Sequence, residues 1–338
     1  MRGRAQIRPF LALLVCLGAC ETASSAVAPA GPQAGKIADF FWVTLAILGT
    51  VWVLVIVFLL YAAQRRRLPP GEDPGQAPDV DARLTRWVGA ATIVTALIVI
   101  GFLVADVAVG RSLQRLAGKP NAVYVTVIGH QWWWEVRYTA SDPTKEVVTA
   151  NELHIPVGRP VSIAGKSIDV IHSFWVPQLH GKRDLIPGYT TNLWLQADRP
   201  GIYRGQCAEF CGLQHAHMAL LVVAQPEAEY EAWLEQQRDT ALAPTSPVAQ
   251  RGQQVFLATS CALCHSIRGT SAASNNGPDL THVASRLTLG AGTLPNNVGA
   301  LSGWILDPHA AKPGNNMPGN ALATEDLHAL VTYLGGLR

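Results

Sequence analysis

Methionine and charge are both scarce in this chain. Of its 338 residues only three are methionine, and apart from Met1 these are Met218 and Met317, each of which lies near cysteine and histidine. Charged residues make up 15% of the sequence, and the formal net charge is +2. Because no cluster of lysine and arginine is interleaved with aromatic residues, the sequence lacks the basic surface that nucleic-acid binding requires. We therefore expect no nucleic-acid partner.

Two long segments are almost without charge. Phe40 to Ala63 carries none, and Trp87 to Gly110 carries only Asp106. Each is long enough to cross about 30 Å of hydrocarbon as a helix. Five arginines crowd the segment between them, and the positive-inside rule places that segment in the cytoplasm. These observations predict a transmembrane hairpin over residues 37–110, with spans at 40–63 and 87–110 and everything after it outside the cytoplasm.

The N-terminus has the pattern of a secretory signal. Arg2, Arg4 and Arg8 precede a short apolar run that is too short to span a membrane. The run ends in Leu17-Gly-Ala-Cys20, which resembles the lipobox of bacterial lipoproteins and implies cleavage after residue 19 and acylation of Cys20. A signal cut elsewhere, or kept as an uncleaved helix, is the alternative. We expect the chain in the inner membrane of a bacterium, with its later domains on the periplasmic side.

The pattern of apolar and polar residues changes after residue 120. Short apolar runs separated by turn residues predict strands of a small antiparallel sandwich or barrel over 120–225. These runs are 123–128, 154–156, 161–163, 192–196, 201–204 and 218–223. Residues 226–249 predict a terminal helix followed by a flexible linker. Residues 250–338 form a last module, all α, with helical stretches at 250–257 and 324–337.

Cysteine is the next scarce residue, with six in the chain. Cys16 and Cys20 belong to the N-terminal segment, so two close pairs remain, Cys207 with Cys211 and Cys261 with Cys264. In an exported chain, two short-range disulfides are the ordinary expectation.

The second pair predicts a different chemistry. Cys261-Ala-Leu-Cys264-His265 is the C-x-x-C-H motif that attaches c-type haem. The two thiols bond to the haem vinyl groups, and the imidazole of His265 reaches the iron. Met317, in a loop before the last helix, is the expected second axial ligand, since His/Met ligation suits electron transfer. His282, His309 and His328 are the alternatives to Met317.

The first pair lies in a cluster of soft ligands. Cys207, Cys211, His215 and Met218 fall within twelve residues. Thiolate, imidazole and thioether favour copper over calcium or magnesium. Zinc remains open, because His172 could complete a four-ligand structural site.

The pattern C-x-E-x-C-x-x-x-H-x-x-M, together with "DVIHSFWVP" and "GHQWWWEVRY", resembles subunit II of haem–copper cytochrome c oxidases. The C-terminal module resembles a class I cytochrome c, so the whole is similar to the caa3-type branch. The resemblance implies a cupredoxin-like barrel behind the membrane hairpin. It also implies a binuclear copper centre, CuA, whose ligands are His172, Cys207, the Glu209 carbonyl, Cys211, His215 and Met218.

Further roles follow from the same resemblance. The Glu209 side chain is expected at a magnesium site shared with subunit I, and Trp132 is expected where electrons enter the copper centre. Extended geometry would place Trp132 and Trp134 on one side of a strand and Trp133 on the other. One departure is Leu84, which stands where the family often has a glutamate near a proton pathway; Asp79 or Asp81 could substitute.

The function implied is an electron relay. Haem c accepts electrons from cytochrome c or another one-electron donor, and CuA passes them to subunit I, which reduces oxygen, in a complex that also contains subunit III. Two alternatives stay open at this point. One is a membrane-tethered copper-binding or copper-delivery protein with a cytochrome module, and the other is the CuA electron-transfer subunit of a different reductase.

Overall fold

The computed structural model describes residues 24–65, 78–114, 121–140 and 142–338. They form two compact units, one within Gly35–Gly118 and one that combines the residues before it with those after it. The predicted signal, Cys20 and most of the arginine-containing connecting segment lie outside the described residues. So do the side chains of Asp79 and Asp81.

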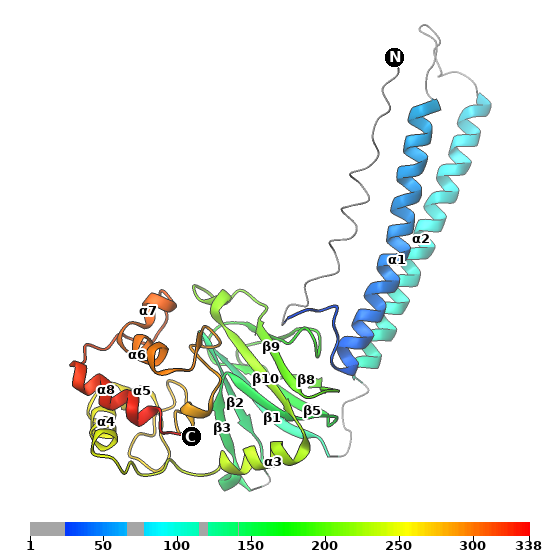
Figure 1. The fold of residues 1–338 in the computed structure, drawn as a ribbon. Coiled ribbons are helices and arrows are strands. Elements are labelled where there is room, and N and C mark those ends of the chain that lie inside the picture. Colours follow the sequence, from blue (N-terminus) through cyan, green and yellow to red (C-terminus); the bar gives the residue numbers. More distant parts are fainter. Residues whose placement is uncertain (1–23, 66–77, 115–120, 141) are drawn as a thin grey trace, which may run out of the picture. The chain divides into compact units, whose positions relative to one another are not determined.

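The first unit is a pair of long helices, α1 (Pro32–Arg65) and α2 (Pro78–Gln114) (Figure 1). With 34 and 37 residues, each exceeds the ~20 residues that span a bilayer. Their apolar side chains are exposed along most of their length, as at Trp52 and Phe58. Near the ends joined to the second unit, Phe40 packs edge-on against Phe102, and Lys36 Nζ donates to the Ser112 carbonyl at 3.3 Å. The two predicted long apolar helices are therefore confirmed, and each extends beyond its predicted apolar run.

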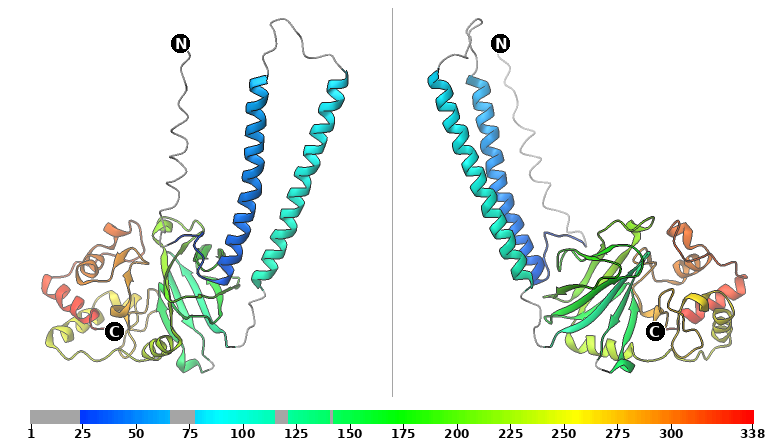
Figure 2. Two further views of the ribbon diagram at one scale, coloured as in Figure 1. Left: turned by 45° about the vertical axis from the view of Figure 1, so that its right-hand side comes forward. Right: turned by 180° about the vertical axis from the view of Figure 1, so that it is seen from behind.

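The second unit contains a β-domain of two five-stranded sheets (Figure 2). Their hydrophobic core lies between them and includes Val127, Trp134, Phe174 and Leu220. One sheet has the order β3 (Val147–Ala150), β2 (Trp133–Tyr138), β1 (Val123–His130), β5 (Val161–Ser167), β8 (Thr191–Leu195). The other has the order β4 (Glu152–Pro156), β10 (Ala219–Gln225), β9 (Gly201–Cys207), β6 (His172–Trp175), β7 (Arg183–Leu185).

The sheets are mixed, so the prediction of an antiparallel domain is wrong in part. β1 pairs in parallel with β5, and β4 pairs in parallel with β10. Parallel neighbours need a crossover connection. Between β1 and β5 the chain supplies one by running through β2 and β3 and then crossing to β4 in the opposite sheet.

The C-terminal domain is helical and has a separate core. α4 (Pro247–Ala258) and α8 (Thr324–Leu334) cross closely at Gly252, where a Cβ would lie 2.0 Å from the Ala329 carbonyl oxygen. Phe256, Leu330 and Tyr333 are buried in this core. Between these two helices the chain forms α5 (Cys261–Cys264), α6 (Val298–Leu306), α7 (Pro308–Ala311) and the short strands β11 (Thr288–Leu289) and β12 (Leu294–Pro295).

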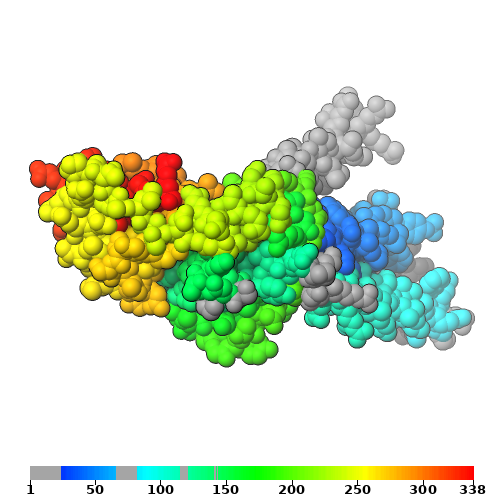
Figure 3. All heavy atoms as spheres, turned by 90° about the horizontal axis from the view of Figure 1, so that it is seen from below, coloured from blue at the N-terminus to red at the C-terminus, as the bar shows by residue number. Residues whose placement is uncertain are grey.

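The segment between the two domains is bound rather than free. After α3 (Glu227–Gln236), the guanidinium of Arg268 donates to the carbonyls of Gln237 and Arg238, and Ala241 N donates to the Arg268 carbonyl at 2.9 Å. Figure 3 shows this segment as a continuous band on the surface, from green into yellow. The predicted flexible linker is therefore held at its start, because backbone carbonyls after α3 find donors on the C-terminal domain.

Candidate functional site

Three neighbouring strands of the second sheet bring the soft ligands together. His172 begins β6, Cys207 ends β9, and Met218 directly precedes β10. β6 and β9 are antiparallel with Phe174 opposite Cys207, so the start of one strand meets the end of the other. The loop after β9 then carries Cys211 and enters the short helix η3 (His215–His217).

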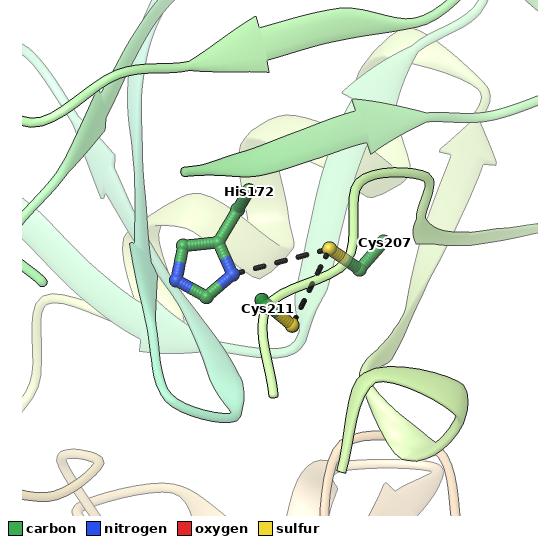
Figure 4. A group of neighbouring side chains, drawn as sticks. All are labelled: His172, Cys207 and Cys211. Atoms are coloured by element: carbon green, nitrogen blue, oxygen red, sulfur yellow. Dashed lines mark hydrogen bonds between the residues drawn. The ribbon is translucent and has the colours of Figure 1, made fainter. Parts of the chain in front are cut away.

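The side chains of His172, Cys207 and Cys211 converge at this place (Figure 4). The Cys207 and Cys211 sulfur atoms lie 3.8 Å apart. His172 Nδ1 lies 3.9 Å from the Cys207 sulfur, and His215 Nδ1 lies 3.7 Å from the Cys211 sulfur. The Met218 sulfur is 3.9 Å from Cys211, and the carbonyl oxygen of residue 209 is 3.2 Å from Cys207.

The separation of the sulfur atoms distinguishes a disulfide from a metal site. A disulfide bond is about 2.05 Å long, and both cysteines are free. Two sulfurs held about 2.3 Å from one tetrahedral metal ion are about 3.8 Å apart, which is the distance found. The donor set therefore fits a metal bound by both sulfurs.

The second imidazole, that of His215, lies apart from the first. The ligand atoms of His172, Cys207 and Cys211 lie within 4.8 Å of one another, and among the described residues this group does not extend to His215. Each imidazole instead lies beside a different sulfur. This arrangement suits two ions that share two sulfurs.

The electrostatics of the cysteines favour a bound cation. The hydrogen bond from the Cys211 thiol lowers the pKa of Cys207 far below its usual range, and that same bond raises the pKa of Cys211. Burial alone would lower the pKa of His172, but hydrogen bonds to Asp169 and Cys207 raise it. The lowered pKa of Cys207 thus provides one thiolate beside His172, and metal binding releases the remaining protons from ligands of this kind.

Two residues that the sequence did not indicate hold His172 in place. Asp169 Oδ1 lies 2.8 Å from His172 Nε2, which leaves Nδ1 to face the sulfurs. Gly129 lies against the ring, so that a Cβ there would be 2.6 Å from His172 Cδ2. A glycine inside a strand often marks a close approach of this kind, and this was the one signal available in the sequence.

Trp132 lies outside the strand that was predicted to contain it. β2 begins at Trp133, and Trp132 is in the preceding turn, where its indole Nε1 donates to the Cys211 carbonyl at 2.9 Å. Its side chain is buried, so it does not form the exposed aromatic patch expected of a carrier docking site. Trp134 is fully buried against His172 and Phe174, and Trp133 stacks on His130.

The C-x-x-C-H motif forms α5 and the residue that follows it. The Cys261 and Cys264 thiols are free, and both side chains are partly exposed. The His265 Nδ1 pairs with the Pro278 carbonyl at 2.8 Å, and among the described residues its Nε2 has no hydrogen-bond partner. This is the tautomer that iron ligation needs. Burial lowers the pKa of His265, which keeps the ring neutral.

Gly277 lies next to this ring, where a Cβ would be 2.8 Å from His265 Cε1. Met317 is partly exposed in the loop between α7 and α8, and its N–H donates to Asn315 Oδ1 at 2.8 Å. Among the alternatives to Met317, His282 Nε2 pairs with the Asp239 carbonyl and His309 Nδ1 accepts from Gly314 N. Both rings are therefore engaged elsewhere. The Glu209 carboxylate pairs with Lys182 at 3.3 Å on the surface.

Comparison with known proteins agrees with both halves of the second unit. Residues 140–225 match the family model for the periplasmic domain of cytochrome c oxidase subunit II, and residues 249–338 match that for cytochrome c. A solved structure of the periplasmic domain of cytochrome oxidase subunit II from Bradyrhizobium japonicum is 27% identical. The match covers 34% of this chain and 93% of the solved chain, with a TM-score of 0.32.

Two relatives are both described as cytochrome c oxidase subunit 2. The protein of Bacillus sp. strain PS3 is 33% identical over 70% of this chain and 67% of its own. That of Alkalihalophilus pseudofirmus is 36% identical, and the match covers 97% of this chain and 95% of the relative. Because that similarity runs through the helix pair, the β-domain and the helical domain together, the chain belongs to the cytochrome c oxidase subunit 2 family.

Proposed function

We propose that this chain accepts one electron at a time at a haem c in its C-terminal domain and passes it through a binuclear copper centre in its β-domain to the oxygen-reducing subunit. Family membership makes the chain a membrane-anchored component of a respiratory oxidase with an extracellular domain, and its two domain matches imply copper and haem c. The arrangement of two imidazoles, each beside its own sulfur, carries the proposal of two copper ions.

The residues that would hold the copper ions are His172, Cys207, Cys211, His215, Met218 and the carbonyl of Glu209. Bound copper supplies a one-electron redox change. The chain holds these ligands rigidly, because Asp169 fixes His172 and the Trp132 and Gln131 side chains both donate to the Cys211 carbonyl. His172, Cys207, Cys211 and Met218 are buried, which excludes water from most of the site.

The residues that would hold the haem are Cys261, Cys264, His265 and Met317. The two thiols would form the covalent bonds, and the pairing of His265 Nδ1 with Pro278 would orient the imidazole toward the iron. Met317 completes the axial pair in this proposal; of its alternatives, His282 and His309 are engaged elsewhere, and His328 is the one that remains.

The finer assignments belong to the same proposal. The connecting segment between α1 and α2 would face the cytoplasm, so that the chain crosses the membrane twice. The Glu209 carboxylate would reach a magnesium ion at the boundary with subunit I by leaving Lys182, with which it pairs on the surface. Association with subunit III is proposed on family resemblance alone.

Metal analysis of the full-length chain, purified in detergent and loaded with copper, tests the central proposal. We expect two copper ions and one haem per chain, and an EPR signal in which one unpaired electron is shared between both coppers. His215→Ala should lose this shared signal, whereas His217→Ala, a matched change in the same short helix, should keep it. A single copper, or zinc alone, in the wild-type chain would refute the binuclear centre.

A further inference from the structure

The loop that carries Met317 is seated on the turn that carries Trp132. Lys312, at the start of this loop, is only 3% exposed. Its Nζ donates to the Trp132 carbonyl at 3.0 Å and to the Gly290 carbonyl at 3.1 Å. Because Trp132 belongs to the β-domain and Gly290 to the C-terminal domain, a single ammonium group binds both domains.

Asn316, the residue next to Met317, makes a second connection. Its Nδ2 donates to the Gln131 carbonyl at 2.9 Å. The Gln131 side chain in turn donates from Nε2 to the Cys211 carbonyl at 2.8 Å. Gln131 therefore bonds at its backbone to the neighbour of the proposed haem ligand, and at its side chain to a proposed copper ligand.

Contacts beside this bridge fix the arrangement further. Gln214 Nε2 donates to the Pro313 carbonyl at 2.5 Å. Ala219 N donates to the Ala291 carbonyl at 3.0 Å, and Leu287 N donates to Glu152 Oε1 at 2.6 Å. Each of these hydrogen bonds joins the two domains, and all of them would break if the domains separated.

Burial of Lys312 shows that this is a built interface. Lysine is almost never fully buried unless it is paired, and a buried charge without partners is strongly unfavourable. Here the two carbonyl acceptors come from different domains, so Lys312 Nζ keeps both hydrogen bonds only while the domains are docked. A contact formed in passing would leave such a side chain hydrated.

We propose that Asn316 and Lys312 are positioning residues that dock the Met317 loop on the Gln131–Trp132 turn, so that electron transfer takes place within one fixed arrangement of the two domains. The inference rests on the proposed function. In the step, one electron leaves the haem iron, which is oxidised, and reaches the copper centre, which is reduced. No bond or proton changes, and the domains do not swing on a linker.

Two backbone amides that donate hydrogen bonds from one domain to the other provide a direct test of the docking. The N–H groups of Ala219 and Leu287 are hydrogen-bonded only across the interface, so their hydrogen exchange measures undocking. In the full-length chain loaded with haem and copper, Asn316→Ala and Lys312→Met should each speed exchange at both amides about tenfold, as loss of hydrogen bonding across the interface predicts. Asn192→Ala, an exposed change on β8, should leave both rates unchanged.

The electron-transfer rate from haem to copper, measured after rapid photoreduction of the haem, is the second readout. We expect it to fall in Asn316→Ala and Lys312→Met, with haem and copper spectra that match those of the wild type. Unchanged hydrogen exchange in both variants would overturn the proposed docking of the two domains. Faster hydrogen exchange with an unchanged electron-transfer rate would overturn the role of this docking in electron transfer. If the wild-type chain holds no copper pair, the proposed function fails, while the exchange rates still report on the docking.

Discussion

Single residues carry most of what the sequence could say about the site. Cys207, Cys211, His215, Met218 and the C-x-x-C-H motif are recognisable because soft ligands at such spacing are rare, whereas the full set with His172 and the Glu209 carbonyl is what the family resemblance implies. The structure places the ligand atoms of His172, Cys207 and Cys211 within 4.8 Å of one another. Asp169 and Gly129 could not be found in this way, because an aspartate in a turn and a glycine in a strand are common. Their importance depends on which ring lies beside them, and that is a property of the folded sheet pair.

Gly129 offers a test of how tightly His172 is placed. In Gly129→Ala the new methyl group would lie 2.6 Å from the ring, closer than carbon atoms approach, so the imidazole must move. We expect weaker copper binding and an altered copper absorption spectrum while the β-domain stays folded. Gly49→Ala, in α1 with open space around it, is the matched control. An unaltered copper spectrum in Gly129→Ala would show that the ring tolerates displacement.

Asp169 tests the support of the same ring from its other nitrogen. Asp169 also accepts from Gln131 N at 2.6 Å and Val170 N at 2.7 Å. Burial alone would raise the pKa of Asp169, but the hydrogen bond with His172 and these two backbone bonds lower it. Asp169→Asn removes the charge that orients His172, and loss of such a partner typically weakens metal binding about 10–100-fold. Copper competition titrations of this variant, compared with Asp198→Asn on the surface, measure the effect. If Asp169→Asn and Asp198→Asn bound copper equally well, Asp169 would stabilise only the turn and not the metal site.

At the scale of elements, long or strongly patterned segments were predictable and short ones were not. α1, α2, α4 and α8 lie where the sequence predicts helices. β6 and β7 escaped notice because four and three residues show no periodicity. α6 was missed because its sequence, VGALSGWIL, contains two glycines. The parallel pairing of β1 with β5 depends on how the chain passes between the sheets, which local sequence does not record.

The pairing of β1 with β2 contains a buried charge cluster that makes stability depend on pH. Glu135 on β2 contacts His130 on β1 at 3.1 Å, and also contacts Arg137. Burial alone would raise the pKa of Glu135, but these two partners lower it below its ordinary value of 4.5. The stabilisation is therefore complete above pH 4.5 and is lost as the pH falls through the lower folded value.

Glu135→Gln should accordingly lower the free energy of unfolding by about 2 kcal/mol at neutral pH. The difference from the wild type should shrink as the pH falls below 4.5. Thermal unfolding of the full-length chain across this range measures both effects. Glu231→Gln, which removes an exposed partner of Arg159, should cost about 0–1 kcal/mol. A deficit that stays constant with pH would mean that packing, and not the carboxylate charge, is responsible.

On the scale of the whole molecule, the β-domain and the C-terminal domain each have their own core, and Lys312 of the C-terminal domain binds the Trp132 carbonyl. Removing residues 245–338 should therefore leave the copper centre and assembly with the oxygen-reducing subunit intact. It should also uncover the Gln131–Trp132 turn. We expect oxygen uptake by the truncated complex to fall sharply at low donor concentration and to rise with added soluble cytochrome c.

Steady-state oxygen uptake over a range of donor concentrations, with copper content measured in parallel, checks this expectation. The intact complex is the control, since its haem should be reduced by donor at concentrations too low for the truncated form. Equal turnover of both forms at low donor would place the C-terminal haem outside the electron path.

The burial of Lys312 between Trp132 and Gly290 also bears on how the protein responds to dissolved salt. Mobile ions screen exposed charges beyond about 10 Å at 0.1 M, but they screen buried groups much less. The rate of electron transfer between the two domains should thus not depend on ionic strength. The rate of encounter with an external donor, which takes place on exposed surface, should depend on it. Because the two domains are fused, only the first step of the relay, from the external donor to this chain, should depend on salt concentration.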